Sequence, residues 1–353
     1  MSRATPRLPD PELLGTRPFG SPELGAAVRS SRTVVALSGG ADSTALMLSL
    51  VRLRSWLGGK PPFDLVAAHF NHSIRGEAAD GDEAFASGLC KELGVPFVSG
   101  RGDVPAAAGR TGESLEMAAR RLRRDFLRRV AEETGAAAIS TGHTLDDQAE
   151  LFFLRLRRGA SCRGLGGMPF CSPWDGSPAL LAVKPLLGVR HEALCAWLRG
   201  EGRQWREDAS NAALDADRNK IRHMVLPAAE KAFGASFFAT LGRTMAMLRD
   251  AADVVSEAAE AAAPDPLAPP APPGAAAGRA AAWAKAKRAA ARERIARALY
   301  ALGVDPEAVR LDAIDGVWGV LSRPGGGKIG LGNGLRASVV RGSLRLEPDP
   351  GHS

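Results

Sequence analysis

Short apolar runs alternate with longer helical patterns along the first half of the chain. The apolar, largely β-branched or small runs predict buried strands at residues 33–37, 64–70, 95–98 and 136–140. Apolar residues at helical spacing predict helices at residues 45–53, 80–93, 114–134 and about 145–157. Strands that alternate with helices are typical of an α/β fold, so we expect a Rossmann-like parallel sheet.

The pattern changes after Pro227. Helical spacing continues to about residue 255, and a basic helix at 279–302, a helix at 309–321 and three short strands with glycine turns follow. This predicts a helical region and then a small α+β C-terminal domain. The expected organisation is an N-terminal arm at 1–31, a main α/β domain at 32–228, a helical connector at 229–260, a low-complexity Ala/Pro/Gly linker at 261–278 and a C-terminal domain at 279–350.

Composition and charge narrow the class of protein. The 353 residues carry a net charge of +7, which makes an anionic polymer such as RNA a reasonable partner. The four cysteines form no C-x-x-C pair and no zinc spacing, so free thiols in a reducing cytoplasm are expected. No apolar stretch of about 18 residues occurs, which predicts a cytoplasmic protein without a membrane partner.

A polar, glycine-containing stretch joins the first predicted strand to the first helix, and it consists of Ser38, Gly39, Gly40, Ala41, Asp42 and Ser43. The two glycines let the backbone approach a ligand closely, and the free N–H groups at the helix start favour an anion. Asp42 would repel a bare phosphate unless a divalent cation or a cationic group lies between them. The alternative is a simple strand-to-helix turn with a capping residue.

Polar residues also follow the second strand, where His69, Asn71 and His72 could bind a base, a ribose or a phosphate. A metal site is the alternative, although no third ligand is evident. The helix at 114–134 carries closely spaced arginines, Arg123 among them. We expect this face to meet an anion, the alternative being a solvated helix surface.

A second motif follows the strand at 136–140 and runs from Thr141 to Glu150 through His143. Asp147 and Glu150 are three residues apart, which places them on one face of the first turn of a helix. Such carboxylates could hold a magnesium ion or bind the amino groups of a cationic substrate. Alternatively, they only complement the helix dipole.

Together these motifs resemble a known family. The loop at 38–43 resembles the pyrophosphate-binding loop of the PP-loop ATP pyrophosphatases, and the ordered set of motifs resembles the tRNA(Ile)-lysidine synthetases. The residues that carry the resemblance are Ser38 to Ser43, His69-x-Asn71-His72-x-x-Arg75, Ala119-Arg120-x-x-Arg123, Thr141 to Glu150, Arg158-Gly159, Lys184 to Leu187, Trp205-x-Glu207-Asp208-x-Ser210-Asn211 and Arg218-Asn219-x-Ile221-Arg222-His223.

The resemblance implies an ATP- and Mg²⁺-dependent ligase. Such an enzyme adenylates the C2 carbonyl oxygen of the wobble cytidine of tRNA(Ile) with a CAU anticodon. Free L-lysine then attacks C2 and displaces AMP to form lysidine, which changes decoding from AUG to AUA. A homodimer is left open. Two alternatives are a PP-loop enzyme for tRNA cytidine 2-thiolation, with Cys162 and Cys171 as the thiols in question, and an inactive protein that binds nucleotide or RNA.

The resemblance also assigns roles to single residues. ATP would be bound by the loop at 38–43 together with His69 and His143, with Asp42 near the reacting centre. Lysine recognition and catalysis are expected at Arg123, Asp147 and Glu150. Which carboxylate acts as the base is not decided by the sequence.

Overall fold

The computed structural model describes residues 31–56, 63–72, 77–175, 177–206, 216–262, 264–272, 275–304, 309–332 and 334–349. Nearly all of the expected N-terminal arm lies outside these ranges, as do Arg75 and the motif residues from Glu207 to Asn211. The chain divides into two compact units. The first unit comprises Met1–Glu150 and Met168–Gly242, and the second comprises Leu151–Gly167 and Arg243–Ser353.

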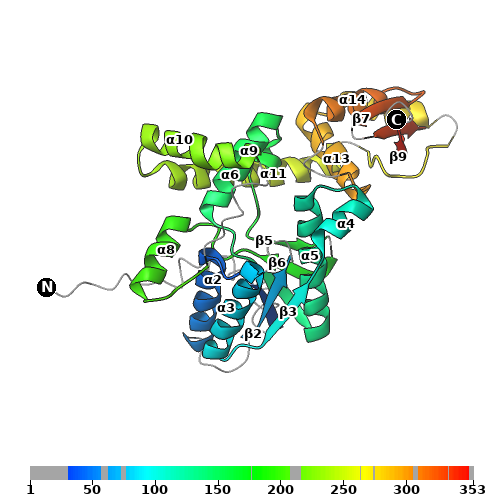
Figure 1. Ribbon diagram of the computed structural model, residues 1–353. Helices are drawn as coiled ribbons and strands as arrows, with labels where there is room; N and C mark the ends of the chain where they lie inside the picture. Colours follow the sequence, from blue (N-terminus) through cyan, green and yellow to red (C-terminus); the bar gives the residue numbers. More distant parts are fainter. Residues whose placement is uncertain are drawn as a thin grey trace. The chain divides into compact units, whose positions relative to one another are not determined.

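A six-stranded sheet forms the centre of the first unit (Figure 1). Its strands are β1 (Ser31–Ala36), β2 (Phe63–Asn71), β3 (Phe97–Arg101), β4 (Ala136–Ser140), β5 (Cys171–Trp174) and β6 (Ser177–Val183). In the order β3-β2-β1-β4-β6-β5, all neighbours are parallel except β5 and β6. The predicted Rossmann-like parallel sheet is confirmed, and the structure adds β5 and β6 at one edge.

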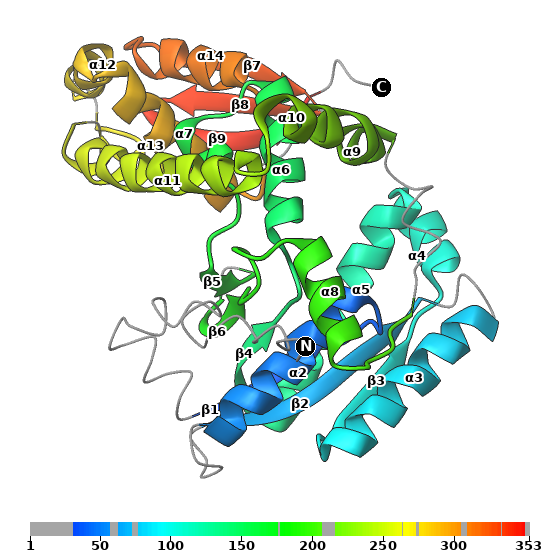
Figure 2. The same cartoon turned by 90° about the vertical axis from the view of Figure 1, so that its left-hand side faces the viewer.

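Helices cover both faces of this sheet. Those of the first unit include α2 (Ala41–Trp56), α3 (Glu77–Leu93), α4 (Val104–Thr111), α5 (Leu115–Thr134), α8 (His191–Gly200), α9 (Ala216–Lys220), the π-helix η3 (Ile221–Val225) and α10 (Leu226–Phe233). Side chains of α2, α3 and α8 share one core cluster, and those of α5 belong to another. Figure 2 shows α8 beside α2.

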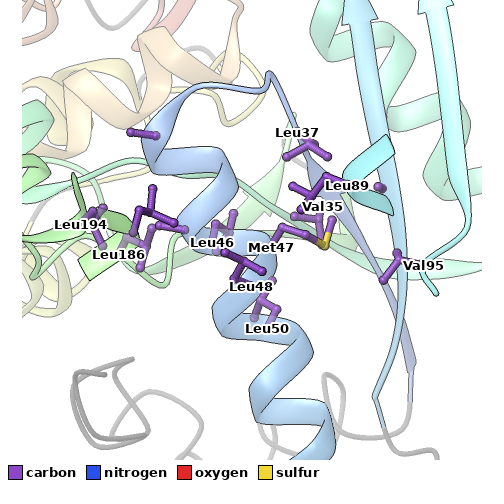
Figure 3. Close-up of a cluster of buried hydrophobic side chains, with 14 of the residues drawn as sticks. Val35, Leu37, Leu46, Met47, Leu48, Leu50, Leu89, Val95, Leu186 and Leu194 are labelled. Carbon is purple, nitrogen blue, oxygen red and sulfur yellow. The ribbon is translucent and has the colours of Figure 1, made fainter. Parts of the chain in front are cut away.

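Alternation along the strands explains this layering. Val35 of β1 belongs to the cluster with α2, whereas the preceding Val34 belongs to the cluster with α5. Successive side chains of a strand point to opposite faces, so a strand buried on both sides is apolar at every position. Figure 3 shows the first cluster, with Leu46 and Leu50 of α2 packed near Val35.

The second unit contains a three-stranded antiparallel sheet and several helices. The strands are β7 (Gly327–Gly332), β8 (Leu335–Val340) and β9 (Ser343–Pro348), and the helices that lie wholly in this unit are α7 (Cys162–Leu165), α12 (Ala276–Lys285), α13 (Arg288–Ala301) and α14 (Leu311–Leu321). Its core is built around Trp283, whose carbonyl accepts a hydrogen bond from Trp318 Nε1 at 2.9 Å. The predicted small α+β domain is confirmed.

Two expectations for this part of the chain need correction. The stretch at 264–272 is not a free linker, because Leu344 N donates to Pro266 O at 2.7 Å and Ala271 N donates to Arg341 O at 2.9 Å. The expected helix at 279–302 is interrupted at Ala286, which has an extended backbone. No glycine or proline marks this break, so burial of Ala286 in the core overrides local helix propensity.

Two further helices, α6 (Leu145–Arg158) and α11 (Phe237–Ala262), contribute residues to both units. Within the described part of the chain, none of the helices combines the length and apolar character needed to cross a membrane.

Candidate active site

The loop between β1 and α2 is closed by a serine hydroxyl. Gly39 has a φ of +94°, a conformation that side chains other than glycine rarely adopt. Ser43 Oγ accepts hydrogen bonds from Ser38 N and Gly39 N, both at 3.2 Å, and donates to Gly40 O at 3.0 Å. The backbone amides of the loop therefore converge on one oxygen atom, as they would on an anion.

Neighbouring segments brace this loop. His69 is 4% exposed at the end of β2, and its Nδ1 donates to Leu37 O at 2.9 Å, just before the loop. On the other side of the loop, Arg206 N donates to Gly39 O at 2.9 Å. The structure thus shows His69 supporting the strand that carries the loop, while its contact with a nucleotide stays a prediction.

The loop after β4 packs directly on the loop at 38–43. A Cβ atom on Gly142 would lie 3.1 Å from the backbone of Asp42 and from Ser43 N. Only glycine allows this approach without displacing main-chain atoms. The contact places the start of α6 against the loop at 38–43.

The first turn of α6 fixes several segments at once. Thr144 and Asp147 form a reciprocal cap, in which Thr144 N donates to Asp147 Oδ2 at 2.8 Å and Asp147 N donates to Thr144 Oγ1 at 3.4 Å. The Gln148 amide binds both backbone groups of Met168, at 2.9 Å and 2.8 Å. Asp146 accepts a hydrogen bond from His191 N at 2.7 Å. This turn is therefore an anchor point for the surrounding loops.

Glu150 is held by two arginines. Its side chain is 1% exposed, and its oxygens accept hydrogen bonds from Arg218 Nε at 2.6 Å and Arg222 Nε at 2.5 Å. Arg218 also reaches Asp147 Oδ1 at 3.3 Å. Arg222 lies in the π-helix η3, a rare conformation that often occurs at functional sites. The structure brings Asp147 and Glu150 together as predicted, and it adds two cations to them.

The arginines of α5 fall into two groups. Carboxylates pair with Arg121, Arg124, Arg128 and Arg129. Among the residues that the structure describes, Arg120 and Arg123 have no such partner, and neither does the buried Lys184. Arg123 is an exposed residue, and its pKa is lowered by desolvation from nearby protein atoms and by the charges of the adjacent Arg120 and Arg124.

His143 lies within the electrostatic field of these unpaired cations. Its Nδ1 is 2.8 Å from Thr141 Oγ1. Its pKa is lowered to about 4, mainly by desolvation; Asp147 opposes this shift, and the charges of Arg123, Lys184 and Arg120 contribute to it. His143 is therefore neutral near pH 7, and the cations beside it are balanced by no carboxylate of their own. Such a cluster attracts an anionic group.

A family model described as a PP-loop domain matches residues 21–229, more than half of the chain. The chain belongs to the PP-loop family. The glycine-containing loop at 38–43 lies within this match, and we refer to it below as the PP-loop.

Relatives of this PP-loop protein carry a consistent name. It is 37% identical over 230 residues to a tRNA(Ile)-lysidine synthase of Symbiobacterium thermophilum, with 64% of this chain and 45% of the relative covered. It is 39% identical over 275 residues to a tRNA(Ile)-lysidine synthase of Thermus thermophilus, with 78% and 50% covered. The predicted resemblance is confirmed, and the chain spans about half the length of these curated relatives.

A solved structure supports the fold of the PP-loop protein. The U34-tRNA thiolase NcsA from Methanococcus maripaludis, determined with its 4Fe-4S cluster, superposes with a TM-score of 0.54 at 18% identity, and the match covers 68% of this chain and 79% of the thiolase. At this identity the likeness concerns the fold alone.

Sequence reasoning missed one contact at the PP-loop. His191 Nδ1 lies 2.7 Å from Asp42 Oδ1, and this hydrogen bond is the main reason that the pKa of His191 is raised. His191 is the first residue of α8, a helix that the sequence analysis did not predict. The ion-pair roles of Arg218 and Arg222 were likewise not predicted, although both stand in a motif quoted for the family resemblance.

Proposed function

We propose that this protein is a tRNA(Ile)-lysidine synthetase. It would use ATP to adenylate the C2 carbonyl oxygen of the wobble cytidine of CAU-anticodon tRNA(Ile), with release of pyrophosphate, and then ligate free L-lysine to C2 with release of AMP, in the bacterial cytoplasm. The observation that carries the proposal is the packing of Gly142 on Asp42 and Ser43, which joins the PP-loop to the acidic turn of α6. Similarity to the named lysidine synthases supports it.

The PP-loop would bind the phosphates of ATP. The amides of Ser38 and Gly39 already converge on Ser43 Oγ, so a phosphate oxygen would replace an existing acceptor of the same kind. This arrangement stabilises the negative charge that develops when pyrophosphate leaves the α-phosphorus.

Magnesium fits the donor set at this loop. Among the described residues, no group of three or more His, Cys, Asp and Glu side chains gathers to hold an ion by itself. Magnesium bound to a nucleotide usually takes one or two carboxylates, with phosphates and water as its other ligands. Asp42, in the first turn of α2, would be the protein's carboxylate. Bound there, the ion neutralises charge on the phosphates.

Free lysine would bind between the unpaired cations and Asp147. The cluster of Arg120, Arg123 and Lys184 suits its α-carboxylate or a phosphate of the adenylated cytidine. From the residues that the structure describes, Asp147 Oδ1 receives one long hydrogen bond, at 3.3 Å from Arg218, so it can still accept one from an amine.

Glu150 suits a supporting role better. Both of its oxygens are engaged by guanidinium groups and its side chain is 1% exposed. We therefore assign Asp147 as the residue that orients the ε-amine of lysine and takes its proton, since only a neutral amine can attack C2. Glu150 would hold Arg218 and Arg222 in place.

The C-terminal domain would bind tRNA through fewer cations than its sequence indicates. Arg292 pairs with Asp315, Arg294 donates to Pro264 O, and Arg297 binds Glu260. The exposed cations that remain near the junction of α12 and α13 are Lys285, Lys287 and Arg288. We propose that they contact tRNA phosphates, where each contact would make binding more sensitive to salt.

The direct test is ATP-dependent incorporation of labelled lysine into an unmodified CAU-anticodon tRNA(Ile) transcript. The methionine tRNA with the same anticodon is the control. Incorporation into the isoleucine tRNA alone supports the proposed reaction and its selectivity. Release of pyrophosphate without lysine incorporation would overturn lysine as the second substrate, and sulfur transfer to the tRNA would then be measured.

A further inference from the structure

We propose that His191 is a positioning residue for Asp42 and keeps this carboxylate away from the amides of the PP-loop. The inference rests on the proposed use of ATP and names a residue to which none of the motifs assigned a role. Its basis is the 2.7 Å contact between His191 Nδ1 and Asp42 Oδ1, which joins α8 to the first turn of α2.

The imidazole ring is fixed at both nitrogens. Cys195 Sγ lies 3.4 Å from His191 Nε2, one helical turn further along α8. With the proton on Nδ1, the ring donates to Asp42 and accepts from the thiol, so every polar atom has a partner. The ring can therefore adopt this position without gaining a charge.

The backbone of His191 is fixed as well. Asp146 Oδ2 accepts from His191 N at 2.7 Å, and Asp146 Oδ1 accepts from Arg190 Nε at 3.1 Å. Asp146 in turn belongs to the first turn of α6, which packs beside the PP-loop. His191 thus sits on a rigid support, as a residue that orients a catalytic group requires.

The contact decides where the Asp42 carboxylate points. A carboxylate in the first turn of a helix is attracted to the free N–H groups there, which in this chain adjoin the Ser38 and Gly39 amides proposed to bind phosphate. His191 engages Oδ1, and among the described residues nothing donates to Oδ2. Asp42 can then offer Oδ2 to a cation while the amides stay open to the phosphates.

The experiment compares His191→Ala with His191→Asn, whose side-chain amide can place an N–H where Nδ1 donates. Glu192→Gln, at the neighbouring exposed position, is the matched control. Two readouts are used on the full chain: equilibrium binding of a non-hydrolysable ATP analogue with magnesium, and the KM for ATP in tRNA-dependent pyrophosphate release. The KM for lysine is measured in the transfer reaction.

His191→Ala is expected to weaken analogue binding and to raise the KM for ATP, each by about tenfold. This is the effect expected from the loss of one charge-assisted hydrogen bond. His191→Asn should recover most of this loss, and the KM for lysine should stay unchanged in both variants. Unaltered ATP parameters in His191→Ala, no recovery in His191→Asn, or an equal rise in the KM for lysine would each overturn the inference. Failure of lysine ligation would leave the analogue-binding test intact, so the two proposals fail separately.

Discussion

Replacing Glu150 with glutamine tests whether the ion pairs of α6 stabilise the first unit. The substitution keeps the shape of the side chain but turns one acceptor into a donor that faces a guanidinium group. Charge-assisted hydrogen bonds contribute about 1.5–3 kcal/mol each. The Arg218 and Arg222 side chains are 35% and 40% exposed, so solvent screens part of this contribution. We expect Glu150→Gln to lower the free energy of unfolding by about 3 kcal/mol.

Thermal unfolding followed by circular dichroism measures this effect. For a unit of this size, 1 kcal/mol corresponds to about 2–4 °C, so Tm should fall by about 6–12 °C. The control is Glu133→Gln, which removes an exposed ion pair with Arg129 at 3.9 Å and should leave Tm nearly unchanged. The double variant Glu150→Gln with Arg222→Gln should cost less than the sum of the single changes. Equal Tm losses in the two glutamate variants would refute the reasoning.

Four further predictions concern the chemistry and the electrostatics of the site. Asp147→Asn should slow lysine transfer about 10²–10⁴-fold while tRNA-dependent pyrophosphate release persists, and equal loss in both steps would contradict a base role. His143 should titrate with a pKa of about 4 by NMR, and Lys184→Met should raise that pKa; an unchanged value would mean that Lys184 does not act on His143. The pKa of His143 lies below the ordinary value, so the neutral ring stabilises the fold above about pH 6.5. As the pH falls to about 5, the free energy of unfolding measured in urea should therefore decrease by up to about 2 kcal/mol. The His143→Gln variant should not show this decrease. Gly142→Ala should weaken ATP binding, since its methyl group would press on the backbone of the PP-loop, and unaltered binding would show that this contact can relax.

The parts of the fold that the sequence predicted are those governed by local pattern. Val34 and Val35 are apolar because both faces of β1 are covered, and this pattern is visible in any window of a few residues. The break at Ala286 has no such signature, because it arises from packing against residues far along the chain.

The same limit applies to the site. Asp147 and Glu150 were found because their spacing on one helix turn is local. Their partner Arg218 follows Glu150 by 68 positions, and His191 follows Asp42 by 149. Pairings over such separations depend on the order of strands in the sheet, which residue spacing does not report. The sequence shows the run of arginines in α5 but not which of them are paired. The structure pairs four of them with carboxylates, and this distinguishes Arg120 and Arg123 from the rest.

The first turn of α6 has a consequence for mutational tolerance. Each polar side chain there meets its own set of partners: a backbone amide and Arg190 for Asp146, the helix cap and Arg218 for Asp147, a peptide group for Gln148 and two guanidinium groups for Glu150. Because these partners are fixed in position, even the exchange of aspartate for glutamate at 146 or 147 would displace the carboxylate from them by one methylene. In a saturation mutagenesis library this turn should therefore accept almost no substitutions, and second-site suppressor mutations should arise in the segments that contact it.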